Sequence, residues 1–61
     1  MTQELVIWRL ARLMIELHGS AAQGEAAARA DERFRHTRFR AAARWNKVAA
    51  KIAELQTRTV H

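Results

Sequence analysis

The chain contains no proline and only two glycines, so few of its residues interrupt a helix. Alanine, arginine, glutamate and leucine, which all have high helix propensity, are abundant instead. Proline lacks the backbone N–H and clashes with the preceding helical turn, so its absence removes the strongest helix breaker. The sequence therefore predicts an all-α fold.

The small size of the chain is the second constraint. Its 61 residues make one domain, 1–61, close to the lower limit for folding alone. There is no cysteine, and His18, His36 and His61 are too widely spaced to pair as metal ligands, so we expect no disulfide, metal or cofactor. A small chain without these stabilising features commonly depends on self-association. We therefore expect a homo-oligomer, most simply a dimer.

Residues 2–18 are predicted to form the first helix. Its polar residues Arg9, Arg12 and Glu16 fall within roughly 60° of one another when the helix turns by about 100° per residue. Apolar side chains dominate the remaining circumference, an arc too wide for a helix with one neighbour. We expect this helix to be central, buried against other helices of its own chain or of a second copy. Its internal charges argue against a signal peptide or a membrane span.

A compact corner is predicted at His18-Gly19-Ser20. Gly19 suits the left-handed position after a helix C-terminus, and His18 lies favourably at the negative end of the helix dipole. Ser20 and Gln23 have the spacing of a capping box, which would open the next helix at once. That second helix is predicted over residues 21–35 and is rich in alanine, so neighbouring backbones can approach closely.

Residues 38–56 are predicted to form a third helix. Its apolar side chains recur at alternating spacings of four and three, which defines one helical stripe: Ala41, Trp45, Val48, Ile52 and Leu55. The final segment, residues 57–61, is mostly polar and is expected to fray.

The segment RFRHTRFR, residues 33–40, leaves two arrangements open. In one, a single helix runs from residue 21 to 56, and the chain is a two-helix hairpin with a long second arm. A continuous helix would, however, place Phe34 and Phe39 roughly 140° apart. In the other, a turn near residues 36–37 lets both rings point inward, with Thr37 capping the third helix. Burying a second phenylalanine contributes about 1.5–3 kcal/mol, more than the helix-dipole terms that oppose the turn, so we favour the three-helix arrangement.

Several short motifs resemble a group of alphaproteobacterial helical proteins of about sixty residues whose function is not established. The motifs are His-Gly at 18–19, Arg-Ala-Asp-Glu at 29–32, Trp45, and Ala-Glu-Leu at 53–55. The resemblance spans nearly the whole chain and implies three helices, but no activity. Members of that group commonly carry a Gly-Asp turn where this chain has Thr37-Arg38.

Basic residues gather in the second half of the chain. Residues 33–51 carry seven of the eleven Lys and Arg residues and no acidic residue, and the net charge is +5. Four of them are predicted to share one face of the third helix within roughly 60°. With Arg33 they form the predicted partner-binding residues: Arg33, Arg40, Arg44, Lys47 and Lys51. Such a face suits an acidic protein surface best, DNA or RNA as the alternative, and a membrane surface least.

The aromatic residues are predicted to pack rather than to stack on nucleic-acid bases, because they recur at helical spacing among aliphatic residues. Together with aliphatic neighbours they form the predicted core or oligomer contacts: Trp8, Ile15, Phe34, Phe39, Trp45, Val48 and Ile52.

No group of side chains has the composition of a catalytic site. With one aspartate, few hydroxyls and no thiol, the chain cannot assemble a carboxylate pair or an activated nucleophile. The sequence therefore predicts a non-catalytic cytoplasmic module that binds an acidic partner. The alternative is a small nucleic-acid-binding dimer that uses the same face.

Overall fold

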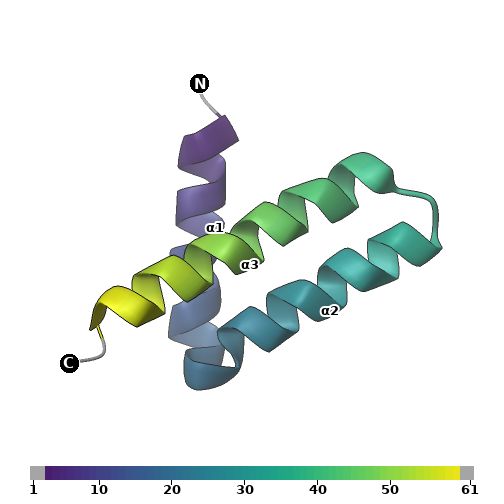
Figure 1. Cartoon of the computed structure of the whole chain (residues 1–61). Coiled ribbons are helices and arrows are strands. Elements are labelled where there is room, and N and C mark those ends of the chain that lie inside the picture. The colour runs from purple at the N-terminus through teal and green to yellow at the C-terminus, as the bar shows by residue number, and fades with distance from the viewer. Residues whose placement is uncertain (1–2, 60–61) are drawn as a thin grey trace.

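The computed structural model describes residues 3–59, and their secondary structure is helical apart from a turn at 36–38. Helix α1 spans Gln3–His18, a short 3-10 turn, η1, spans Gly19–Ala21, α2 spans Ala22–Arg35, and α3 spans Phe39–Thr59. The all-α class predicted from the sequence is confirmed. Helices α2 and α3 run antiparallel as a hairpin, and α1 crosses that hairpin steeply near its open end (Figure 1).

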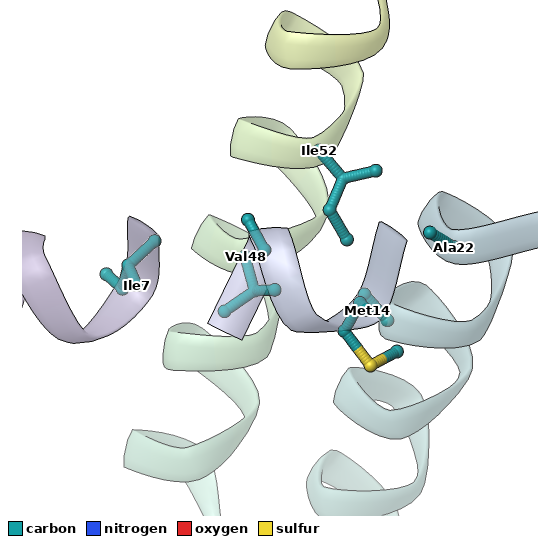
Figure 2. Close-up of a cluster of buried hydrophobic side chains, with 7 residues drawn as sticks. Ile7, Met14, Ala22, Val48 and Ile52 are labelled. Atoms are coloured by element: carbon teal, nitrogen blue, oxygen red, sulfur yellow. The ribbon is translucent and has the colours of Figure 1, made fainter. Parts of the chain in front are cut away.

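The core is made of small and medium apolar side chains. On α2 the buried positions recur every four residues and are all alanine, Ala22, Ala26 and Ala30. Because alanine projects little from the backbone, α3 can lie close against α2. The larger buried side chains come from the other two helices and form one cluster with Ala22 and Ala26: Ile7 and Met14 from α1, Val48 and Ile52 from α3 (Figure 2). Burial of each of these four side chains contributes about 1.5–3 kcal/mol to folding. Because the described residues bury so few large side chains, the total contribution of the core is small.

The prediction that residues 2–18 form a central, buried helix is wrong for the single chain. Only one side of α1 is buried, through Ile7, Ala11 and Met14. Its other apolar side chains include Leu13 at 48% and Leu17 at 67% exposure. The physical reason is that the alanine face of α2 makes the α2–α3 hairpin the closest pair. Since α1 then crosses this pair steeply, much of its circumference stays outside.

The corner between α1 and α2 follows the prediction at Gly19 and departs from it at Ser20. Gly19 has a φ of 57°, the left-handed conformation that glycine adopts without strain. Ser20 lies inside η1, and the N-cap of α2 is Ala21, which makes no side-chain cap bond. The predicted capping box is therefore wrong, because the 3-10 turn moves the helix start beyond Ser20. The corner is held instead by Gln56, whose Nε2 donates to the Gly19 carbonyl oxygen at 2.9 Å.

The turn at residues 36–38, between α2 and α3, is a Schellman motif. Thr37 has a φ of 58°, and its N–H donates to the Phe34 carbonyl at 3.0 Å. The Arg38 N–H donates to the Arg33 carbonyl at 2.8 Å, so two carbonyls at the end of α2 are satisfied. Glycine normally occupies the left-handed position, and here a β-branched residue does so.

Thr37 does not cap α3, contrary to the prediction. Its hydroxyl donates to the His36 carbonyl at 2.6 Å, and its left-handed backbone directs the chain into Arg38. The first turn of α3 is closed by the Ala42 N–H, which donates to the Arg38 carbonyl at 2.9 Å.

The last turn of α3 extends beyond the predicted end at residue 56. The hydroxyl of Thr57 donates to the Ala53 carbonyl at 2.7 Å, and Arg58 lies 3.8 Å from the Glu54 carboxylate. Both contacts lie in the last turn of α3, which is helical to Thr59, and the fraying of residues 57–61 stays a prediction. Residues 60 and 61 lie outside the described part of the chain.

Candidate partner-binding surface

Four cationic side chains lie along one flank of α3, beside the buried stripe. We call Arg40, Arg44, Lys47 and Lys51 the basic face. They share this flank because their spacings of four, three and four keep them on one side of a helix. The first three are exposed, whereas Lys51 is half-buried. The α3 positions of the predicted partner-binding set are therefore brought together.

The two ends of the basic face differ in their electrostatic balance. Within residues 3–59, no carboxylate lies within 4 Å of the charged groups of Arg40, Arg44 or Lys47. Lys51, in contrast, is 3.1 Å from Glu54. Its hydrogen bond and its charge lower the pKa of the Glu54 carboxyl below the ordinary value. The part of the basic face from Arg40 to Lys47 therefore carries three positive charges without a carboxylate nearby.

A hollow of about 380 Å³ lies where the basic face meets α1. Lys47 and Lys51 line it from α3, and Ile7 lines it from α1. The carboxylates of Glu4 and Glu54 also line this hollow. Because both signs of charge are present there, the surface suited to an acidic partner is confined to the part of α3 that precedes Lys51.

Arg33, the fifth predicted partner-binding residue, is on α2 and lies apart from the basic face. Its guanidinium carbon lies 5.8 Å from the centre of the Trp45 ring, and its Nη1 pairs with Glu32 at 3.2 Å. Trp45 lies roughly 140° around α3 from Arg40, since five residues separate them. Attraction between the guanidinium and the indole face holds Arg33 on the α2 side of the hairpin.

Arg29 is a residue that the sequence analysis missed. Its guanidinium lies 5.4 Å from the Trp45 ring centre, and its Nε is buried without a hydrogen-bond partner among the described residues. Arg29 precedes Arg33 by four residues, so the two share one face of α2 and both reach the same indole. The four-residue spacing of Arg29 and Arg33 can be read from the sequence. Their shared contact with Trp45 cannot, because Trp45 is on α3 and the contact depends on how α2 and α3 pack.

The predicted core and oligomer residues separate into two groups. Val48 and Ile52 are fully buried, and Ile15 and Trp45 are half-buried and packed against the core. Trp8 is exposed at 39%, with the Arg12 guanidinium 5.1 Å from its ring centre.

The two phenylalanines of RFRHTRFR are not in the core either. Phe34 and Phe39 are 61% and 57% exposed, and their rings pack edge to face with centroids 5.2 Å apart. The turn brings the two rings together at the tip of the hairpin, beyond the buried alanines of α2, so the prediction that both point inward is wrong. They therefore form an exposed aromatic pair beside Arg38.

The described part of the chain holds no cluster of three or more His, Cys, Asp or Glu side chains arranged to bind a metal. Within the same residues, none of the helices has both the length and the apolar character needed to cross a membrane.

Comparison with protein-family models, characterised proteins and solved structures finds no match, so the resemblance noted from the sequence stays a prediction.

Proposed function

We propose that this protein is a small non-catalytic cytoplasmic interaction module whose α3 helix binds an acidic protein surface. The observation that supports this most directly is the set of three exposed cations, Arg40, Arg44 and Lys47, with no carboxylate within 4 Å among residues 3–59. An acidic partner would supply the missing counter-charges. Complementary charge of this kind contributes association rate and selectivity more than raw affinity.

Nucleic acid is the second candidate ligand, and one observation favours it. The exposed pair Phe34 and Phe39 lies beside Arg38 at the hairpin tip. Single-stranded nucleic acids bind to surfaces that combine exposed aromatic rings with positive charge, because every base has a face that can stack. Double-stranded DNA offers no such stacking, so the two nucleic-acid forms should differ if the aromatic pair takes part.

A binding experiment with two probes distinguishes the candidates. Poly-glutamate serves as the acidic polypeptide, and a fluorescent single-stranded oligonucleotide serves as the nucleic acid, each measured at low and at physiological salt. The test variant carries Arg40→Gln, Arg44→Gln and Lys47→Gln. Its matched control carries Arg12→Gln, Arg35→Gln and Arg58→Gln, which removes the same net charge from exposed positions elsewhere.

We expect the test variant to lose poly-glutamate binding at least about tenfold more than the control, because three adjacent charge contacts are removed. Equal losses in both variants would mean that only net charge matters, and would contradict a defined basic face. Oligonucleotide binding that depends steeply on salt and weakens in Phe34→Ala would favour the nucleic-acid candidate instead.

A further inference from the structure

Helix α1 carries a second apolar stripe beside the one that packs on the hairpin. The buried stripe is Ile7, Ala11 and Met14. The neighbouring stripe has the same alternation of four and three residues and consists of Val6, Leu10, Leu13 and Leu17. Its first two members are half-buried, and the last two are exposed at 48% and 67%. This spacing is the one by which two helices pair along a seam.

Two opposite charges border this second stripe on one edge. Arg9 and Glu16 are seven residues apart, so they lie in the same row along α1, separated by roughly 10 Å of helix rise. Both are exposed, and neither forms an ion pair with another residue of the described chain. When a second α1 lies antiparallel beside the first, the Arg9 of each helix therefore points toward the Glu16 of the other.

We propose that the second stripe is the contact surface for a second copy of this chain, with the two α1 helices antiparallel. Placing the two-fold axis between residues 11 and 12 sets Leu10 opposite Leu13 of the second copy, and Val6 opposite Leu17 of the second copy. All four apolar residues of each stripe are then matched, and no other antiparallel register matches all of them. The same surface serves both copies, as two-fold symmetry requires.

The bordering charges select this arrangement. In the antiparallel register Arg9 lies beside Glu16 of the second copy, with an offset of about 3 Å along the helix axis, within reach of both side chains. Symmetry repeats the pair, so the dimer gains two ion pairs. In a parallel arrangement each charge would instead face the side of the neighbouring helix that carries Ile7 and Met14 and packs on its own hairpin, and no ion pair would form.

A second copy would also increase the apolar surface that the small core buries. Burying Leu13 and Leu17 across a two-fold axis adds four large apolar side chains to an assembly in which residues 3–58 of each chain bury four large ones, Ile7, Met14, Val48 and Ile52. This interface lies on α1, so it goes beyond the acidic-partner binding proposed for α3, and either can fail without the other.

Analytical ultracentrifugation of the full chain across a dilution series tests the proposal. Leu13→Arg should weaken dimerisation about a hundredfold, because it places a charge at the seam. Trp8→Arg is the matched control, since Trp8 is 39% exposed and lies roughly 140° around α1 from Leu13, and it should leave the dimer intact. Circular dichroism shows whether each variant retains its helices.

A charge exchange separates the antiparallel dimer from any other contact. Arg9→Glu and Glu16→Arg, each alone, place like charges side by side and should weaken the dimer about tenfold. The double variant restores opposite charges in both symmetric pairs and should recover wild-type affinity. A wild-type chain that is monomeric at high micromolar concentration, or a double variant as weak as the singles, would overturn the proposal.

Discussion

Among residues 3–59, Thr37 is the non-glycine residue that adopts a positive φ. Its φ of 58° lies in the left-handed region, which costs an L-residue with a β-carbon about 1–2 kcal/mol. Branching at the β-carbon makes this region still less favourable. The surrounding structure enforces it, because the Thr37 and Arg38 N–H groups both bond to carbonyls at the end of α2. Replacing Thr37 with glycine should therefore stabilise the folded chain.

The expected increase in the free energy of unfolding of Thr37→Gly is smaller than the backbone strain that the substitution relieves. Glycine has more freedom in the unfolded chain, which subtracts about 0.4–1 kcal/mol. The substitution also removes the exposed hydroxyl bond to the His36 carbonyl, a further few tenths of a kcal/mol. We therefore expect Thr37→Gly to raise the free energy of unfolding by about 0.5–1 kcal/mol. For a chain of this size that corresponds to a rise in Tm of roughly 2–8 °C.

Thermal and urea unfolding followed by circular dichroism at one fixed protein concentration measure this effect. Thr37→Ala is the control, because it removes the hydroxyl and the branching but keeps a β-carbon in the left-handed region. The glycine variant should exceed the alanine variant by about 1 kcal/mol. Equal stability of the two would refute the argument. Thr37→Pro should lose about 3 kcal/mol or more, because proline fixes φ near −65° and has no N–H for the Phe34 carbonyl.

Three further perturbations check the packing and the charges. Trp45→Ala should lower the free energy of unfolding by about 2–3 kcal/mol, less than for a fully buried aromatic residue, and unchanged thermal melting would contradict its packing role. Gln56→Met keeps the side-chain length but removes the bond to the Gly19 carbonyl, and should cost about 0.5–1 kcal/mol in urea unfolding. The pKa of Glu54 is lowered by Lys51, so its stabilising contribution is complete above the ordinary glutamate pKa and is lost as the pH falls through the lowered value. An NMR titration should show the Glu54 midpoint returning to the ordinary range in Lys51→Met.

The features that could be predicted are those set by local sequence. Gly19 is the single glycine between two apolar runs, and the left-handed corner follows from its lack of a β-carbon. The stripe that contains Trp45, Val48 and Ile52 follows from a spacing that any helix converts into one face. The grouping of Arg40, Arg44 and Lys47 rests on the same geometry, which is why the predicted basic face is present on α3.

The predictions that failed are those that depend on how the helices pack against one another. Sequence spacing states how wide the apolar arc of α1 is, but not which part of it another helix will cover. The inward placement of Phe34 and Phe39 assumed that the core reaches the turn, whereas the last buried side chain of α2 is Ala30. Likewise, the position of Arg33 over an indole on α3 depends on the approach of two helices, which no local pattern encodes.

The two proposed surfaces lie on different helices, and this has a measurable consequence. If α1 pairs the chains and α3 binds acidic ligands, Arg44→Gln should weaken binding to poly-glutamate without changing the dimerisation constant. Leu13→Arg should leave the intrinsic affinity of each α3 unchanged and remove only the avidity that comes from presenting two basic faces together. A short acidic peptide that reaches one face should therefore bind Leu13→Arg and the wild-type chain equally, whereas long poly-glutamate should bind the wild-type chain more tightly. Equal loss of both ligands in Leu13→Arg would mean that the α1 surface contacts the ligand itself, and the division of roles between the helices would be wrong.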